Sequence, residues 1–401
     1  MRLLTFSTLY PNGVMPQHGI FVETRLRHLV ASGRVEVRVI APVPWFPFRH
    51  AAFGEYAGHA AVPAAEVRHG LQVTHPRFVR LPKIGMSSAP FTLARTAIRA
   101  ARRLIADGYD FDIIDAHYFY PDGVAATMLG KALGKPVVIT ARGTDINLIP
   151  QHALPRRMIL NAARDSAAMV TVCSALKDEL LALGVDGKKV TVLRNGVDLA
   201  LFHPEDRAAA RGAFGMTRFS LLSVGHLIPR KGHDLVVEAL AALPDAQLLI
   251  AGSGPEEGRL RALAARLGVA DRVAFLGALP QSRLRQLYSG ADCLVLASSR
   301  EGWANVLLEA MACGTPVVAS NVWGTPEVVA APEAGVLMTE RSAAGIVDAV
   351  AALRGRLPSR ASTRRYAERF SWDDTTAGLL ALFDNVAAQA MRRANGVLRH
   401  A

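Results

Sequence analysis

The strongest constraint on the fold is an alternation of short apolar runs and amphipathic stretches along nearly the whole 401-residue chain. The apolar runs, such as residues 219–224, have the length and the Val, Ile and Leu content of buried strands. The stretches between them, such as residues 233–242, repeat apolar residues at helical spacing. This pattern is typical of parallel sheets whose strands are joined by helices, so the sequence predicts an α/β fold.

The alternation occurs twice, which predicts two doubly wound domains, and 401 residues suit two domains of about 200 each. In the first half we expect strands at 3–7, 35–41, 71–74, 113–116, 137–140, 169–172 and 190–193, with helices at 21–31, 93–106, 123–132, 156–165 and 175–183. In the second half we expect strands at 219–224, 247–251, 272–276, 293–297 and 317–319, with helices at 233–242, 256–267, 282–289 and 306–312. The join is expected near residues 202–204, and a last helix is expected to begin after a cap at Ser371.

The composition indicates a globular protein, with 51% apolar and 20% charged residues. No apolar run reaches the roughly 18 residues of a membrane-spanning helix. The three cysteines, Cys173, Cys293 and Cys313, are too few and too widely spaced to suggest a disulfide framework or a zinc site. We therefore expect a cytoplasmic protein.

The net charge of +12 is concentrated in the first quarter of the chain. Residues 1–110 contain 14 Lys and Arg against 6 Asp and Glu, a balance of +8. Four arginines, Arg95, Arg99, Arg102 and Arg103, fall on one face of a helix expected to start after Pro90. This face could bind an anionic membrane, attract phosphorylated substrates or simply be solvated. Nucleic acid is not expected as a partner, because no aromatic-interleaved basic motif accompanies the charge.

The most informative motif is residues 299–316, SREGWANVLLEAMACGTP, in which Glu301 and Glu309 stand eight positions apart. A strand leads into it, and helical spacing begins at about Asn305, so Glu301 is expected at a helix mouth and Glu309 about one turn inside. The backbone N–H groups of Trp303, Ala304 and Asn305 would then lie at the helix N-terminus, which favours an anion. As an alternative, both glutamates could be solvated surface charges.

This motif resembles that of retaining nucleotide-sugar glycosyltransferases, in particular family 4 of that class, which have the GT-B fold. The matching elements stand at Glu301, Glu309, Ala310, Met311, Ala312, Gly314 and Pro316. The resemblance implies that Glu301 contacts hydroxyls of the donor sugar and that Glu309 contacts the ribose. It also implies that the intervening residues Gly302, Trp303, Ala304, Asn305 and Val306 take part in binding the donor.

A second motif, LLSVGHLIPRKG at residues 221–232, places Arg230 and Lys231 between a strand and a helix. Arginine offers a bidentate fork and lysine a mobile charge, so the pair suits a diphosphate. The resemblance implies that this pair stabilises the leaving pyrophosphate. Around it, further donor-binding positions are expected at Gly225, Gly252, Gly254, Leu276 and Leu279.

In the first domain, candidate residues follow predicted strands, where α/β proteins bind ligands. Gly19 is expected at a helix mouth that faces a phosphate, although the loop is not a GxGxxG fingerprint. His117 matches a family histidine, which implies a catalytic role of donating to a sugar hydroxyl or orienting the reacting groups. Arg142 and Asp145 could bind acceptor or donor oxygens or pair with each other, and Asn195 is expected at a turn near the acceptor.

The resemblance therefore implies a GT-B enzyme with an N-terminal Rossmann-like domain of residues 1–200 and 371–401 and a nucleotide-sugar domain of residues 201–370. The expected reaction is retaining transfer of a sugar from a nucleoside-diphosphate sugar to a glycan or lipid-linked acceptor, in cell-surface polysaccharide or glycolipid assembly. No metal or other cofactor is expected, because Arg230 and Lys231 can neutralise the diphosphate and no Asp-x-Asp motif follows a strand. A GT-B epimerase, a Rossmann-type dehydrogenase and a non-catalytic binding protein are the alternatives. A peripheral position at the inner face of the cytoplasmic membrane is expected if the arginine face binds lipid.

Overall fold

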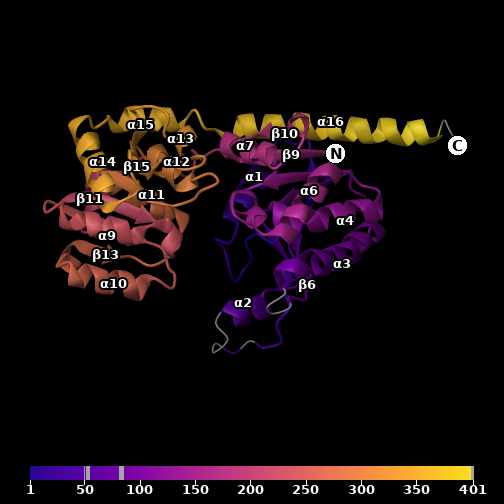
Figure 1. The fold of residues 1–401 in the computed structure, drawn as a ribbon, viewed down its shortest axis with the longest axis horizontal. Helices are drawn as coiled ribbons and strands as arrows, with labels where there is room; N and C mark the ends of the chain where they lie inside the picture. The colour runs from indigo at the N-terminus through magenta and orange to yellow at the C-terminus, as the bar shows by residue number, and fades with distance from the viewer. Residues whose placement is uncertain (49, 51–54, 81–84, 399–401) are drawn as a thin grey trace. The chain divides into compact units, whose positions relative to one another are not determined.

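The computed structural model describes residues 1–48, 50, 55–80 and 85–398, and the chain forms two units. Unit 1 contains Met1–Arg194 and Asp373–Ala401, and unit 2 contains Asn195–Trp372. Each unit has its own parallel sheet with helical crossovers (Figure 1). The prediction of two Rossmann-like α/β domains is confirmed.

Unit 1 is built on an eight-stranded sheet of order β10-β9-β8-β7-β1-β2-β5-β4. Its strands are β1 (Arg2–Phe6), β2 (Glu36–Ile40), β4 (Ala65–Arg68), β5 (Leu71–Thr74), β7 (Ile113–His117), β8 (Val137–Ala141), β9 (Ala168–Thr171) and β10 (Val190–Val192), and β3 (Val43–Pro44) pairs separately with β6 (Arg77–Phe78). Only β4 is antiparallel to its neighbour among these eight strands. Chain order runs outward in both directions from the β1–β7 pair, except that β5 lies inside β4, and this makes the pair the switch point of the sheet.

Helices cover both faces of this sheet, as right-handed crossovers on either side of a switch point require. They are α1 (Ile20–Ala31), α2 (Glu55–Ala61), α3 (Gly85–Ala106), α4 (Val124–Leu133), α5 (Thr144–Asn147), α6 (Ala153–Asp165) and α7 (Ser174–Ala182), with short turns η2 (Phe119–Gly123), η3 (Ile149–Gln151) and η4 (Gly187–Lys189). In Figure 1, α4 lies between α3 and α6.

The last helix, α16 (Trp372–Leu398), completes the core of unit 1. Its buried residues Leu379, Phe383 and Val386 pack in one cluster with Leu3 of β1 and Leu26 of α1. The expected return of the C-terminal helix to the first domain is therefore confirmed.

Helix α3 differs from the prediction, because it begins at Gly85 and contains Pro90 instead of starting after it. A proline inside a helix leaves the carbonyl four residues earlier without its usual partner. Here that carbonyl belongs to Met86, and it accepts a hydrogen bond from the Tyr120 hydroxyl. The replacement donor comes from a distant segment, so the sequence pattern could not show it.

Unit 2 is built on a six-stranded parallel sheet of order β13-β12-β11-β14-β15-β16. Its strands are β11 (Phe219–Val224), β12 (Ala246–Ala251), β13 (Val273–Phe275), β14 (Cys293–Leu296), β15 (Val317–Ser320) and β16 (Gly335–Met338). Its helices are α8 (Arg207–Ala213), α9 (His233–Ala241), α10 (Glu257–Arg266), α11 (Gln281–Gly290), α12 (Asn305–Ala312), α13 (Thr325–Val328), α14 (Ala343–Gly355) and α15 (Arg360–Ala367), with turns η5 (Pro229–Lys231) and η6 (Ala270–Arg272). The switch point is the β11–β14 pair.

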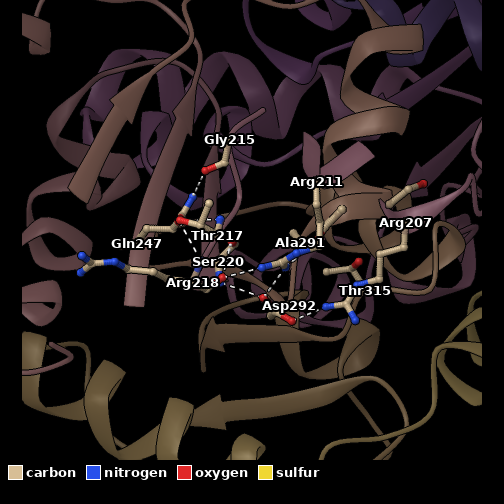
Figure 2. Close-up of polar contacts among 12 residues, drawn as sticks. Arg207, Arg211, Gly215, Thr217, Arg218, Ser220, Gln247, Ala291, Asp292 and Thr315 are labelled. Atoms are coloured by element: carbon tan, nitrogen blue, oxygen red, sulfur yellow. Dashed lines mark hydrogen bonds and ion pairs between the residues drawn. The ribbon is translucent and has the colours of Figure 1, made fainter. Parts of the chain in front are cut away.

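The amino ends of the unit 2 strands are tied by a polar network (Figure 2). Asp292, just before β14, accepts hydrogen bonds from the Ser220 backbone N–H at 2.8 Å and from Arg211 of α8 at 2.9 Å. It also pairs with Arg207 of α8. Gln247 accepts from the backbone N–H groups of Thr217 and Arg218, each at 3.1 Å. This edge is occupied by structural contacts, which leaves the opposite, carboxyl edge of the sheet for ligands.

Candidate functional site

The carboxyl ends of β11 and β14 bring the two predicted donor motifs together. Lys231 Nζ lies 2.6 Å from Glu301 Oε1, and Arg230 Nη1 lies 3.6 Å from the same oxygen. Arg230 also donates to the backbone carbonyl of Arg300 at 2.6 Å, while its own carbonyl accepts from Ser299 N–H at 2.9 Å. Residues 70 positions apart in sequence therefore form one cluster at the switch point of the sheet.

The two cations decide the charge state of Glu301, whose side chain is only 9% exposed. Burial by itself would raise the pKa of this carboxyl, but Lys231 and then Arg230 outweigh burial and hold the pKa below its usual range. Glu301 is therefore ionised, and its single negative charge lies close to the two positive charges of Lys231 and Arg230. A net positive charge remains at this strand end, which suits a diphosphate.

Three glycines let backbone segments approach closely around this cluster. A Cβ on Gly252 would lie 1.8 Å from the Gly225 carbonyl oxygen, and a Cβ on Gly254 would lie 2.5 Å from that of Leu227. At Gly232, which caps α9 with φ +69°, a Cβ would lie 2.2 Å from the Ala297 carbonyl oxygen. Glycine is thus required by packing here, and the loops after β11, β12 and β14 lie against one another.

Helix α12 starts where the sequence predicts, and it carries Glu309 within reach of α11. Ala304 is its N-cap and Trp303 is buried next to it, but the Asn305 N–H already donates to the Trp303 carbonyl at 3.1 Å. Glu309 accepts a hydrogen bond from Tyr288 of α11 at 3.0 Å. Burial raises the pKa of Glu309 to about 7, and this hydrogen bond only partly offsets the rise.

The remaining donor candidates lie at the same edge of unit 2. Leu276 and Leu279 follow β13 and are half-buried, as are Gly302, which precedes α12, and Val306 in its first turn. Asn195 is buried, and its amide donates to the Asn305 side chain at 3.2 Å. Asn195 therefore belongs to the α12 mouth in unit 2, although the sequence associates it with the acceptor.

In unit 1 the switch point lies between β1 and β7, and the predicted residues lie at or after the carboxyl ends of β1, β7 and β8. Gly19 is the N-cap of α1 with φ +69°, and a Cβ there would lie 2.4 Å from the Leu9 carbonyl. The glycine thus lets the loop after β1 press against the mouth of α1. This geometry fits the expected role in approaching a phosphate, which stays a prediction.

His117 ends β7 and is 1% exposed, with both ring nitrogens in contact with charged residues. Nε2 lies 2.9 Å from Asp115 Oδ2, and Nδ1 lies 2.6 Å from Arg142 Nη2. Burial lowers the pKa of His117 to about 4, since the Asp115 charge only partly offsets burial and the Arg142 charge adds to it. The ring is therefore neutral at pH 7, and because the guanidinium can only donate, the ring proton lies on Nε2.

A fourth residue, Arg25 of α1, completes this buried network. Its Nη1 donates to the Thr140 hydroxyl at 2.9 Å, and its Nη2 lies 3.8 Å from Asp115 Oδ1. Burial would raise the pKa of Asp115, but His117 and then Arg25 reverse this and lower the pKa to about 2. The negative charge of Asp115 is thus retained in the interior by its neighbours.

Asp145 orders the turn after β8 through hydrogen bonds to backbone N–H groups. Its carboxylate accepts from the backbone N–H groups of Phe119 at 2.6 Å, Gly143 at 2.7 Å and Arg142 at 3.1 Å. These bonds fix the backbone of Arg142, while the Arg142 side chain extends to His117. Asp145 therefore acts on the site through the loop that it holds.

Sequence reasoning missed three residues of these clusters: Asp115, Arg25 and Tyr288. Asp115 could have been found, because residues two apart in a strand share a face and Asp115 lies two before His117. Arg25 and Tyr288 gave no comparable signal, since Arg25 of α1 contacts strands β7 and β8 and Tyr288 of α11 contacts α12. In the described part of the chain, no group of three or more His, Cys, Asp or Glu residues is arranged to hold a metal ion.

Both halves of the chain match known families. Residues 19–201 match the family described as Glycosyltransferase Family 4, and residues 205–370 match the family described as Glycosyl transferases group 1. Among solved structures, an Anabaena protein, Alr3699/HepE in complex with UDP, superposes with a TM-score of 0.70 over 96% of this chain and 100% of its own, at 21% identity. Sucrose-phosphate synthase from Thermosynechococcus elongatus gives a TM-score of 0.71 over the whole of both chains at 19% identity. These two similarities concern the fold.

Curated relatives share more of the sequence. The chain is 36% identical over 312 residues to a D-inositol 3-phosphate glycosyltransferase of Mycobacteroides abscessus, covering 70% of this chain and 67% of that protein. It is 34% identical over 323 residues to the protein of the same name from Mycolicibacterium vanbaalenii, covering 73% and 70% respectively. The chain therefore belongs to the family 4 glycosyltransferases, which are nucleotide-sugar-dependent enzymes with the GT-B fold.

Proposed function

We propose that this enzyme transfers a sugar from a nucleoside-diphosphate donor to an acceptor hydroxyl with retention of the anomeric configuration, in the assembly of a cell-surface glycan or glycolipid. The observation that carries the proposal is the cluster of Arg230, Lys231 and Glu301 at the switch point of unit 2. It combines two cations suited to a leaving diphosphate with a carboxylate suited to sugar hydroxyls. No metal ion is required in this proposal, because the two side chains supply the positive charge.

The proposed reaction breaks the bond from the anomeric carbon to the phosphate oxygen and forms one to the acceptor oxygen on the same face. The leaving phosphate oxygen takes the acceptor proton, so the enzyme needs no carboxylate nucleophile. Two observations support this route. Glu301 is engaged with two cations, and Glu309 is held by Tyr288 with a pKa of about 7. Catalysis then comes from positioning and from charge stabilisation at the diphosphate.

The donor nucleotide and the acceptor are proposed from the relatives. A bound UDP in the Anabaena structure makes a uridine diphosphate sugar the first donor to test. The curated relatives are named for D-inositol 3-phosphate, so a phosphorylated polyol is a second acceptor class beside a glycan or a lipid-linked sugar. We place the acceptor against unit 1, where the buried His117 network positions Arg142.

We further propose that α3 contacts an anionic membrane surface. Arg95, Arg99, Arg102 and Arg103 are all exposed on this helix, and its sequence contains no acidic residue. Phe91, 53% exposed on the same helix, could add an apolar contact. None of the helices in the described residues is long and apolar enough to span a bilayer.

The function is tested by incubating the protein with a panel of nucleotide sugars and acceptors and measuring released nucleoside diphosphate. The donor panel is first narrowed by thermal shift, where a ligand at about 100 times its Kd adds roughly 2.7 kcal/mol. Retention is read from the anomeric configuration of the product by NMR. An epimerase would release nucleoside diphosphate or a new nucleotide sugar without any acceptor, and a binding protein would shift the melting temperature without turnover. Either result contradicts the proposal.

A further inference from the structure

Unit 1 contains a large cavity that neither the donor cluster nor the His117 network uses. It has a volume of about 850 Å³ and lies between one face of α6 and the segment from the end of α7 through η4. This volume falls within the range of small-molecule sites. Pro150 and Gln151 also line the cavity, and they follow closely in sequence after α5, the short helix that contains Asp145.

The cavity is lined by both positively charged and apolar side chains. Arg156, Arg157, Arg164 and Lys189 contribute four positive charges, and Asp186 is the one acidic residue in the lining. The Asp186 carboxylate already accepts the Lys188 backbone N–H at 3.0 Å as the cap of η4. Leu160, Leu183 and Val185 supply an apolar wall.

Two of the cations are available to a ligand. Lys189 donates to the Arg164 and Ser166 carbonyls at 2.8 and 3.0 Å, and Arg164 donates to the Asn161 side chain. Arg156 and Arg157 are exposed, and neither guanidinium has an ion pair or a hydrogen bond to another residue in the described part of the chain. Two adjacent free guanidinium groups can hold one phosphate by bidentate hydrogen bonds.

We propose that this cavity binds an amphipathic phosphate, with the phosphate against Arg156 and Arg157 and an alkyl chain along Leu160, Leu183 and Val185. The excess of positive charge in the lining favours an anion. The apolar wall favours a phosphate attached to a hydrocarbon chain over free phosphate. Resting on the proposed function, the ligand is the phosphorylated chain of a lipid-linked acceptor. Such a site would hold the acceptor lipid on the unit that carries the acceptor residues.

The test is isothermal titration of the whole protein with octyl, decyl and dodecyl phosphate below their micelle concentrations. Affinity should rise about fourfold for each added CH₂, because each buried CH₂ contributes about 0.8 kcal/mol. Inorganic phosphate and dodecanol should each bind far more weakly than dodecyl phosphate. Equal affinity for inorganic and dodecyl phosphate would overturn the proposal.

Matched variants locate the site. Arg156→Ser with Arg157→Ser should weaken dodecyl phosphate by about tenfold or more, as expected for charge-assisted hydrogen bonds. The control is Arg266→Ser with Arg356→Ser, which removes two positive charges from the exposed surface of unit 2 and should leave this affinity unchanged. Leu160→Ser should weaken dodecyl phosphate and leave inorganic phosphate unaffected. Loss of affinity in Arg102→Ser with Arg103→Ser, and not in the Arg156 and Arg157 variant, would place binding on α3 and overturn the cavity site.

Nucleotide binding separates this proposal from the proposed function. A protein that binds UDP and turns over nucleotide sugar but does not bind dodecyl phosphate contradicts the cavity site alone. A protein that binds dodecyl phosphate through Arg156 and Arg157 but turns over no nucleotide sugar contradicts the acceptor role, and the site itself stands. UDP binding and the far-ultraviolet circular dichroism of each variant show that it is folded.

Discussion

Lys231 pairs with Glu301, and in the proposed reaction it must also hold the donor diphosphate. The Nζ–Oε1 distance of 2.6 Å places the lysine ammonium beside Glu301, at the carboxyl edge of the sheet. Pairing with Glu301 also keeps the ammonium group desolvated and oriented before the substrate arrives. The site is therefore preorganised for an anion.

We predict that Lys231→Ala lowers kcat and weakens binding of the nucleoside diphosphate. A charge-assisted hydrogen bond contributes about 1.5–3 kcal/mol, so each effect should be about tenfold to a hundredfold. Steady-state kinetics and titration with UDP measure the two. Lys188→Ala, which removes an exposed lysine of η4, is the control. Turnover by Lys231→Ala at the level of the control would remove Lys231 from the mechanism.

Substitutions of Glu301, which precedes α12, and of Glu309, which lies in α12, are predicted to have different effects on turnover and on UDP binding. Glu301 faces the proposed sugar as positive charge develops, and its loss also frees Lys231 for phosphate. Glu301→Gln should therefore lower kcat strongly and leave UDP affinity equal or higher. Glu309→Gln should weaken UDP as well as the full donor. The opposite pair of results would require both roles to be withdrawn.

The raised pKa of Glu309 predicts a pH dependence of nucleotide binding. The carboxylate accepts from ribose hydroxyls best when ionised, and a pKa of about 7 leaves it largely protonated below neutral pH. UDP affinity should then rise with pH, by up to about tenfold per unit below the pKa, and level off above it. Glu309→Gln should flatten this rise, whereas any part due to the UDP phosphate should persist. A pH profile that is identical in both proteins would contradict the assignment.

At the scale of elements, the start of α9 depends on close packing against β14. Gly232 has φ +69° and faces the Ala297 carbonyl, whereas Gly268, after α10, has φ +65° and faces open space. Both glycines adopt a left-handed conformation that costs other residues about 1–2 kcal/mol. Only Gly232 adds a backbone clash.

We therefore predict that Gly232→Ala destabilises unit 2 by at least about 2 kcal/mol and weakens UDP binding, because the clash displaces the Arg230–Lys231 turn. Gly268→Ala should cost only the conformational strain and leave UDP binding unchanged. Urea unfolding and UDP titration compare the two variants. Equal costs would show that the β14 contact does not constrain α9.

Helices and strands were predicted correctly where the apolar periodicity of the sequence is strong, and they were missed where this periodicity is weak. Strand β11 has the predicted bounds, and α12 begins within one residue of its expected start. The antiparallel strand β4 was missed because every second side chain is exposed at the sheet edge and the others are only half-buried. β16, α14 and α15 were also missed, although Ser342 and Ser359 cap the two helices as sequence rules describe.

At the scale of the whole molecule, unit 1 is built from two separate segments of the chain, because its core includes the C-terminal helix α16. Phe383 is fully buried in the cluster that contains β1 and α1. We predict that Phe383→Ala lowers the stability of unit 1 by about 3–5 kcal/mol, the range for a buried phenylalanine. Calorimetry with and without UDP should identify the unit affected, because UDP is expected to stabilise unit 2.

Met391→Ala is the control on the same helix, since Met391 is 64% exposed. Its effect on unfolding should be small. If Phe383→Ala shifts only the transition that UDP stabilises, the assignment of α16 to the core of unit 1 is wrong.

The sequence by itself determined the α/β class, the doubling of the unit and the two motifs that supply Arg230, Lys231 and Glu301. Strand burial, helical periodicity and the side chains at strand ends are local properties, and residues 299–316 carry enough of them to indicate the family. Only the tertiary structure decided which charges meet. Asp115 and His117 come from β7, Arg142 from the end of β8 and Arg25 from α1, and Tyr288 of α11 reaches Glu309 of α12. Such contacts depend on sheet order and helix packing, which bring distant residues within hydrogen-bonding distance and which no local pattern in the chain specifies.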